Sequence, residues 1–141
     1  MPVFETTIMI NAPAQVIWDI LVDALSWPTW NTTIDKVDGD VALGKTVTVY
    51  AKVNPGRAFP VKVSKLTPPH RMVWIGGMPL GLFRGVRTYT LSSKGEHATD
   101  FTMHEAYSGP LAGMITRSIP DLQPAFDEFA RSLKLKAEAS R

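Results

Sequence analysis

The sequence predicts an α+β fold in which a curved antiparallel sheet of six or seven strands wraps around a long C-terminal helix. Two short helices are expected between the first two strands. Three observations support this prediction. Short turns join the strand-like segments between residues 34 and 107, which favours antiparallel neighbours. A long apolar stripe at helical spacing follows them, and a shorter one separates the first strand from the others. A curved sheet must cover such a helix, and tends to leave a cavity beneath it.

The N-terminal elements are a strand and two short helices. Residues 3–10, VFETTIMI, are rich in β-branched and aromatic side chains, as strands are. Asn11 offers a helix N-cap, and Pro13 suits a first helical turn. Apolar residues between positions 14 and 24 then recur at helical spacing. Because Pro28 disfavours helical backbone at Trp27, we expect this helix to end there, with a short second helical turn near residues 27–31.

Six further strands are predicted, separated by turn-forming residues. Asn54-Pro55-Gly56 is the strongest of these turn signals. Gly76-Gly77 is expected to break the strand that precedes it. The predicted strands cover residues 34–37, 46–53, 59–66, 71–75, 83–92 and 98–107.

The C-terminal segment carries one apolar stripe. It comprises Ile115, Ile119, Leu122, Phe126, Phe129 and Leu133, which recur every three or four residues as on one helix face. Pro120 and Pro124 interrupt the pattern. We therefore predict a helix over residues 110–118, a kink, and a longer helix from about residue 122 that Asp121 caps and that holds Pro124 in its first turn.

The same spacing predicts which side chains of the long helix face the sheet. Phe126 and Phe129 should be buried, whereas Asp127, Glu128 and Arg131 should face water. We predict a continuous cavity of about 300–1,000 Å³, the usual range for ligand sites, between the sheet and the helix from about residue 122 to residue 136. A space filled solid by Phe101, Phe126 and Phe129 would argue against any bound ligand.

Composition limits the class of protein. The chain has 141 residues, of which 45% are hydrophobic and 20% charged, so a single globular domain over residues 1–141 is expected. A net charge of +2 argues against a nucleic-acid partner. No apolar run is long enough for a membrane span, and residues 1–10 do not look like a signal peptide, so a cytoplasmic location is expected. The chain is expected to be a monomer or a homodimer.

Two charged residues fall on the predicted inner face of the sheet. Arg87 alternates with apolar residues in its strand, and Glu105 does so in the next one. A register in which paired residue numbers sum to about 190 would place Tyr89 opposite Phe101 and Arg87 diagonal to Glu105. An inward charge needs a partner, so the two should pair, either as a polar handle for a ligand or as a structural ion pair.

Other chemistry finds little support. The chain has no cysteine, and His70, His97 and His104 lack the spacing of metal ligands, so no metal site and no cofactor are expected. His70 and His97 fall in predicted loops, and His104 on the outer face. A register error of one residue would turn His104 into the cavity as a candidate general base. No nucleophile elbow, P-loop or dinucleotide fingerprint occurs.

Several motifs together resemble a known superfamily over essentially the whole chain. They are Asn11-Ala12-Pro13, Trp18, Asp23, Trp27-Pro28-x-Trp30-Asn31, Phe83-x-Gly85-x-Arg87-x-Tyr89-x-Leu91 and Glu105-x-Tyr107-x-Gly109. The chain is similar to the SRPBCC (START-like) superfamily with its helix-grip fold, and within it to the polyketide cyclase/dehydrase branch. The resemblance implies a hydrophobic ligand held between the sheet and the C-terminal helix. The prolines near residue 120 depart from the uninterrupted helix of that fold.

The resemblance and the strand faces together predict a ligand site. The expected contacts are Trp30, Trp74, Phe83, Arg87, Tyr89, Phe101, Met103, Glu105, Tyr107, Leu122, Phe126 and Phe129. Our first hypothesis is binding of a small hydrophobic molecule (a lipid, a polyketide or an aromatic compound) by a carrier or sequestering protein.

Two other hypotheses remain open. The first is a cyclase/dehydrase-type enzyme, in which Arg87, Glu105 or Tyr89 would polarise a carbonyl or move a proton. The second is a protein-interaction module, as in relatives that regulate a chaperone ATPase. The apolar segment at residues 77–83 could line an entrance or bind a second subunit.

Overall fold

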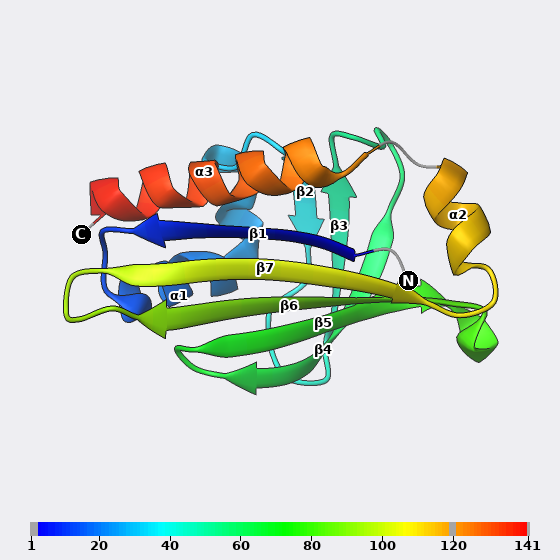
Figure 1. The fold of residues 1–141 in the computed structure, drawn as a ribbon, viewed down its shortest axis with the longest axis horizontal. Helices are drawn as coiled ribbons and strands as arrows, with labels where there is room; N and C mark the ends of the chain where they lie inside the picture. The colour runs from blue at the N-terminus through cyan, green and yellow to red at the C-terminus, as the bar shows by residue number, and fades with distance from the viewer. Residues whose placement is uncertain (1–2, 119–120, 141) are drawn as a thin grey trace.

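A single curled sheet organises the molecule (Figure 1). The computed structural model describes residues 3–118 and 121–140. Seven antiparallel strands lie in the order β1-β7-β6-β5-β4-β3-β2. They are β1 (Val3–Ile10), β2 (Ile34–Asp38), β3 (Thr46–Ala51), β4 (Phe59–Thr67), β5 (Arg71–Met78), β6 (Phe83–Ser93) and β7 (Thr99–Ser108). The predicted fold class is therefore confirmed.

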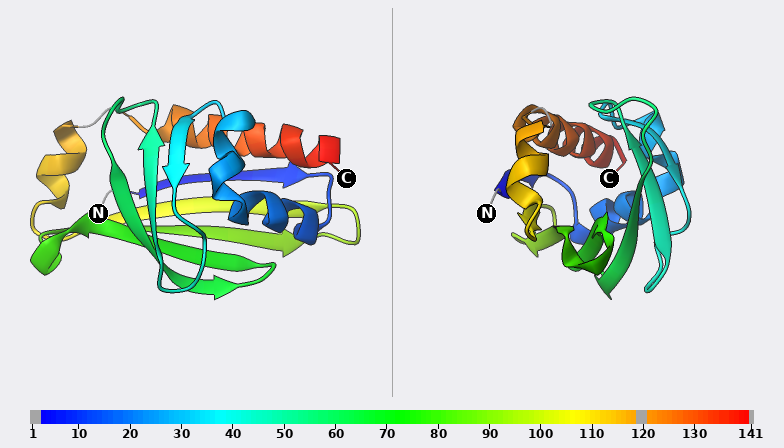
Figure 2. Two further views of the ribbon diagram at one scale, coloured as in Figure 1. Left: turned by 180° about the vertical axis from the view of Figure 1, so that it is seen from behind. Right: turned by 90° about the vertical axis from the view of Figure 1, so that its right-hand side faces the viewer.

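The helices lie at the edges and on the concave side of this sheet. α1 (Ala14–Val22) and the 3-10 helix η1 (Ala24–Thr29) connect β1 to β2, and a short 3-10 turn, η2 (Pro79–Gly81), connects β5 to β6. α2 (Ala112–Ser118) follows β7, and α3 (Gln123–Ser140) ends the described chain. α3 runs along β1, and the sheet curves below it, as the end view in Figure 2 shows.

The hydrophobic core lies between α1, η1, the sheet and the C-terminal part of α3. Ile17 and Leu21 of α1 are fully buried, as are Phe101 of β7 and Leu133 of α3. Trp27 is also fully buried and stacks on Trp74, with ring centroids 5.4 Å apart. These contacts seal one end of the space that the sheet encloses.

The sequence predicted that Gly76-Gly77 would break the strand β5, and this prediction is wrong. The strand continues to Met78 and pairs with both neighbours. A Cβ atom at Gly76 would lie 2.9 Å from Cγ1 of Val61, and one at Gly77 would lie 2.2 Å from the carbonyl oxygen of Phe83. Gly77 also has φ of 138°, which side chains disfavour. The two glycines therefore permit close approach within the sheet.

The N-terminal helices also differ from the prediction in detail. Pro13, and not Asn11, occupies the N-cap position of α1, and none of the described side chains caps that helix. The second helical segment begins earlier than expected, at Ala24, and includes Pro28. A 3-10 helix of only six residues accommodates Pro28, because the missing backbone N–H of the proline removes only one hydrogen bond.

The long helix begins as the sequence predicted. The backbone N–H of Gln123 donates to Oδ1 of Asp121 at 3.0 Å, and Pro124 lies in the first turn. Phe126 and Phe129 are 3% and 2% exposed, whereas Asp127 and Arg131 are exposed to solvent. Glu128 is half-buried. The expected kink involves Ile119 and Pro120, which lie outside the described residues.

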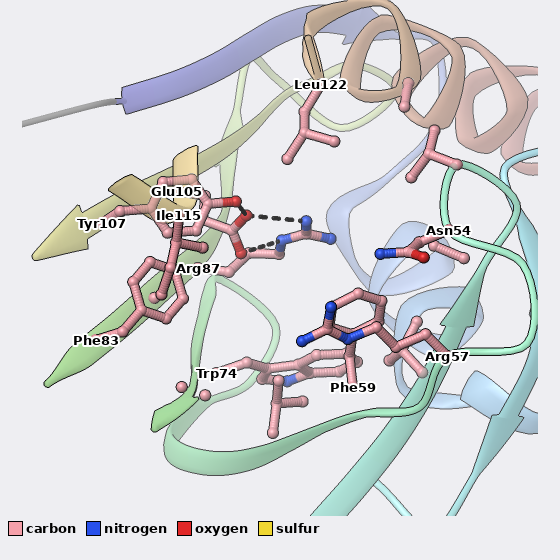
Figure 3. A pocket seen from close by; sticks show the side chains of 18 of the residues that line it. Asn54, Arg57, Phe59, Trp74, Phe83, Arg87, Glu105, Tyr107, Ile115 and Leu122 are labelled. Carbon is pink, nitrogen blue, oxygen red and sulfur yellow. Dashed lines mark hydrogen bonds and ion pairs between the residues drawn. The ribbon is translucent and has the colours of Figure 1, made fainter. Parts of the chain in front are cut away.

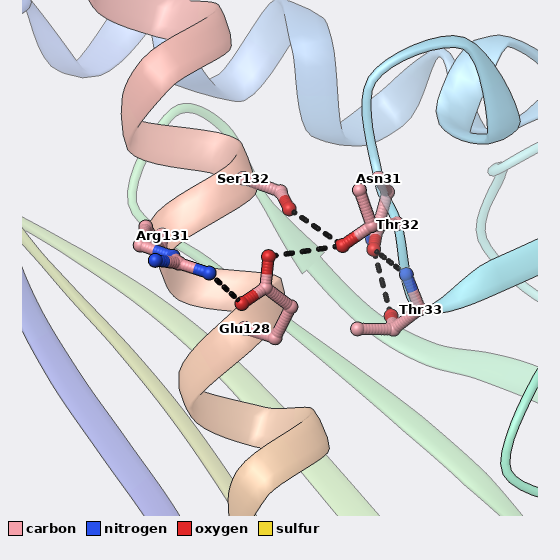
Figure 4. A network of polar contacts seen from close by, with 6 residues as sticks. All are labelled: Asn31, Thr32, Thr33, Glu128, Arg131 and Ser132. Atoms are coloured by element: carbon pink, nitrogen blue, oxygen red, sulfur yellow. Dashed lines mark hydrogen bonds and ion pairs between the residues drawn. The ribbon is translucent and has the colours of Figure 1, made fainter.

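A polar network fastens the middle of α3 to the loop before β2 (Figure 4). Thr32 donates from Oγ1 to Oε1 of Glu128 at 3.0 Å and lies 3.4 Å from Oγ of Ser132. Arg131 forms an ion pair with the same carboxylate. The hydrogen bonds from Arg131 and Thr32 lower the pKa of Glu128. These contacts fix the position of α3 above the sheet.

Candidate functional site

A cavity of about 590 Å³ lies between the sheet and the N-terminal half of α3. Its volume falls within the range of about 300–1,000 Å³ expected of a ligand site. Exposed lining residues are found in the β3–β4 turn, at the end of β5 and on α2. The cavity therefore reaches solvent beside these segments.

The structure places most of the predicted contact residues on the wall of this cavity (Figure 3). The sheet contributes Trp74, Phe83, Arg87, Met103, Glu105 and Tyr107. The helix contributes Leu122, Phe126 and Phe129. Trp74, Met103, Phe126 and Phe129 are each less than 5% exposed, so the wall is mainly a packed apolar surface.

Arg87 and Glu105 form an ion pair on this wall. Nε of Arg87 donates to Oε1 of Glu105 at 3.1 Å, and Nη2 donates to Oε2 at 3.3 Å. Tyr107 donates from its hydroxyl to the same carboxylate, and the Arg87 guanidinium lies 4.8 Å from the centre of the Phe126 ring. Such two-point contacts hold both side chains in fixed positions. The pair expected from the sequence is therefore present.

The register that brings them together differs from the predicted one. Arg87 lies directly opposite Glu105, and Tyr89 lies opposite Met103, not Phe101. The shift is by two residues, so each side chain keeps its predicted face because strand faces alternate with a period of two. The register of a hairpin depends on the geometry of its turn, here residues 94–98 between β6 and β7, and the alternation pattern alone does not specify it.

Burial and charge shape the ionisation of this cluster. Burial opposes the charge on Arg87, but attraction to Glu105 and Tyr89 outweighs it and raises the pKa of Arg87. Burial, reinforced by the Glu105 carboxylate, raises the pKa of Tyr107 above its ordinary value. Burial also raises the pKa of Tyr89 to about 12, against the opposing effect of Arg87. Both hydroxyls thus stay protonated at neutral pH and can donate hydrogen bonds, but cannot act as bases.

These shifts predict alkaline destabilisation. Because the pKa values of Tyr89 and Tyr107 are raised on folding, the unfolded chain loses those protons first, so stability is complete below about pH 10 and falls as the pH rises further. At pH 11 the native chain should carry about two fewer phenolates than the unfolded chain. Ultraviolet absorbance titration of native and urea-unfolded protein measures this difference. Coincident titration curves would contradict it.

Three predicted contact residues do not line the cavity. Tyr89 and Phe101 are buried against Phe129, with ring centroids 6.2 and 6.3 Å away. Trp30 lies beside Trp27 and the same phenylalanine. These rings fill the end of the space under the C-terminal part of α3 and leave the other end open. The sequence predicted that these side chains point inward, but not that one end of the interior is packed while the other end is open.

Tyr89, one of the three candidate catalytic residues, lies away from the cavity wall. Among the described residues its hydroxyl has no hydrogen-bond partner of good geometry, and the oxygen is buried away from solvent. The hydroxyl of Tyr107, by contrast, lies on the cavity wall and contacts Glu105.

Several lining residues were not anticipated. The face of β3 that carries Val49 and Ala51 borders the cavity, and so do Asn54, Arg57 and Phe59 around the following turn. Alternation in residues 46–53 could have identified the β3 face. Nothing in the sequence indicates where Arg57 points, because that depends on how the β3–β4 turn is built. α2 also contributes to the wall, through Ile115 among others.

The remaining candidate features lie apart from the cavity wall. His70 and His97 are exposed. His104 lies on β7, opposite Glu5 of β1 and Thr88 of β6 in the sheet, and does not line the cavity. In residues 3–118 and 121–140, no group of acidic and histidine side chains could hold a metal ion. Within the apolar segment at residues 77–83, Leu80 is 97% exposed, and Met78 and Phe83 line the cavity.

No helix in the described part of the chain has both the length and the apolar character to cross a bilayer.

Solved structures with the same fold come from several bacteria and a plant. An aromatase/cyclase, Zhui, from Streptomyces sp. R1128 matches with a TM-score of 0.75, 14% identity and coverage of 97% of this chain and 93% of the other. A START superfamily protein from Mycobacterium smegmatis matches with a TM-score of 0.73, 14% identity and 99% coverage of both chains. Norcoclaurine synthase from Thalictrum flavum, in complex with dopamine and hydroxybenzaldehyde, matches with a TM-score of 0.70, 16% identity and coverage of 99% and 88%.

The curled sheet around its long C-terminal helix is a helix-grip fold, the same fold as that of the START superfamily protein from Mycobacterium smegmatis. Residues 1–138 match the family described as "Polyketide cyclase / dehydrase and lipid transport". The chain belongs to that family. No curated protein matches the sequence.

Proposed function

We propose that this protein binds one small, largely apolar molecule in the cavity beneath α3, as a carrier or sequestering protein. The observation that carries this proposal is the cavity of about 590 Å³, whose mainly apolar wall holds the polar cluster of Arg87, Glu105 and Tyr107. Sites of that kind bind a ligand by burial of its apolar surface and orient it through a few polar groups.

The polar cluster would orient the ligand. The Arg87 guanidinium and the Tyr107 hydroxyl both face the cavity and both contact Glu105. A ligand carbonyl or hydroxyl oxygen near the guanidinium would accept a hydrogen bond from this charged donor, which is among the stronger polar contacts in proteins. The apolar part of the ligand would lie against Trp74, Phe83 and Phe126.

Filling the cavity should abolish binding. Ala125 lies on α3 and lines the cavity, so the indole of Ala125→Trp would occupy the space proposed for the ligand. We expect the affinity for a neutral fluorescent probe, N-phenyl-1-naphthylamine, to fall at least tenfold, which corresponds to about 1.4 kcal/mol. Fluorescence titration measures the dissociation constant.

Ala139→Trp is the matched control, because it adds the same side chain to an exposed position of the same helix. It should bind the probe as the wild type does. Equal binding by the two variants would show that the probe lies elsewhere. Absence of probe binding by the wild type would contradict the proposed apolar site.

A second candidate function is cyclase or dehydrase-type catalysis. The observation that favours it is the Glu105 carboxylate, which faces an apolar cavity between the donors Arg87 and Tyr107. There the Arg87 guanidinium would polarise a substrate carbonyl, while Glu105 would accept a proton from the adjacent carbon. Incubation with a short poly-β-ketone, followed by mass spectrometry, distinguishes the two functions, because only an enzyme would form the cyclised product lacking one water faster than the substrate forms it in buffer alone.

A further inference from the structure

The cavity wall carries an uncompensated positive charge. Its charged side chains among the described residues are Arg57, Arg87 and Glu105. Glu105 is the partner of Arg87 in the ion pair. Arg57 has no ion-pair partner among the described residues; its guanidinium lies over the Phe59 ring, 5.4 Å from the ring centre. Arg57 is exposed to solvent at the edge of this site, so its guanidinium is hydrated and free to meet an anion there.

A tight turn places Arg57 and Asn54 at the mouth of the cavity. The backbone N–H of Arg57 donates to the carbonyl oxygen of Asn54 at 3.3 Å, and the backbone N–H of Asn54 donates to that of Ala51. This turn joins β3 to β4 and faces the wall that holds Arg87 (Figure 3). Asn54 is half-buried and its amide points toward the same open space.

The ion pair leaves one edge of Arg87 directed away from Glu105. The two hydrogen bonds to the carboxylate use Nε and Nη2, so Nη1 takes no part in them. In Figure 3 this third nitrogen lies on the side of the guanidinium nearest Asn54. Guanidinium edges of this kind bind oxyanions through parallel hydrogen bonds.

We propose that the ligand carries an anionic head group, held at the cavity mouth between Arg57, the Asn54 amide and the outer edge of Arg87. Its apolar body extends inward along the wall formed by Trp74, Phe126 and Leu122. This inference rests on the proposed binding function and names its ligand class, an amphiphile with one oxyanion. Carboxylate and phosphate heads share the required chemistry.

Displacement of N-phenyl-1-naphthylamine by four amphiphiles with the same chain tests the proposal. We expect dodecanoate, dodecyl phosphate or both to compete about tenfold better than dodecanol, because hydrogen bonds to charged groups are strong enough for that difference. Dodecyltrimethylammonium should compete worst. The ranking of the two anions identifies which head group fits.

Arg57→Gln should remove most of this preference and leave the affinity for dodecanol unchanged. Arg84→Gln is the matched control, since Arg84 is exposed and does not line this cavity, and it changes the net charge equally. The preference should persist in that variant. Equal affinity for the anions and dodecanol, or equal effects of the two substitutions, would overturn the anion site alone. Failure of all four compounds and of the probe to bind would contradict the proposed binding function as well.

Discussion

Phe129→Ala should lower the free energy of unfolding by about 4 kcal/mol, within the range known for truncation of a packed aromatic side chain. Phe129 is 2% exposed. Its ring meets Trp27 edge-on at 5.2 Å and stacks on Phe101 at 6.3 Å. One side of the ring borders the cavity, but these neighbours are themselves held by the core and should not collapse into the space that the ring vacates, so most of the cavity cost should remain.

Phe126→Ala provides the contrast. Phe126 lies one turn closer to the open part of the cavity and packs against Phe4 and Arg87. Removal of the Phe126 ring enlarges a space that already exists, so the loss of unfolding free energy should be smaller than for Phe129→Ala.

Leu135→Ala is the surface control. Leu135 is 65% exposed, so this substitution should change the free energy of unfolding by less than about 0.5 kcal/mol. Urea denaturation measures all three. Equal losses for the two phenylalanines would contradict the division of the interior into a packed end and an open end.

Glu105→Gln should cost about 3 kcal/mol, because it leaves the charge of Arg87 on the cavity wall without its partner. The side chains of Arg87 and Glu105 are 23% and 14% exposed. Because solvent in the cavity can partly screen the unpaired charge, the expected cost lies at the lower end of the range for buried pairs. Asp100→Asn on the same strand is the control. Its pair with Lys94 is more exposed, so it should cost about 1 kcal/mol or less.

The variants Arg87→Met, Glu105→Leu and Arg87→Met/Glu105→Leu, measured together with the wild type, form a double-mutant cycle. Replacing both charges by apolar groups removes the unpaired charge, so the loss should be well below the sum of the single losses. Additive losses would show that the two residues act independently. Strong coupling with unchanged probe binding would favour a structural pair, whereas weak coupling with lost binding would favour a ligand handle.

The fold could be predicted from the sequence because its signals are local and repeated. Alternation in β6 and β7 assigned Arg87 and Glu105 to the inner face, and the two-residue difference in register left that assignment intact. The stripe of α3 likewise identified Phe126 and Phe129 as buried. Such periodic patterns reflect which side chains must leave water.

The boundary of the cavity could not be predicted in the same way. Whether an inward ring fills the core or borders open space depends on distances between distant segments, as the contacts of Tyr89 and Phe101 with Phe129 show. Gly76 and Gly77 look like a strand break in the sequence, yet they permit close approach of neighbouring strands. Arg57 reaches the cavity mouth only through the conformation of the β3–β4 turn.

Native mass spectrometry of the protein purified from its own source organism tests the central claim most directly. The wild type should carry one small molecule in addition to the mass of the chain, and denaturation should release an amphiphile. Ala125→Trp, purified in the same way, should have the mass of the chain alone, whereas Ala139→Trp should retain the ligand. A wild-type protein that carries no molecule and binds none of the offered probe or amphiphiles would contradict the claim that this cavity is a binding site.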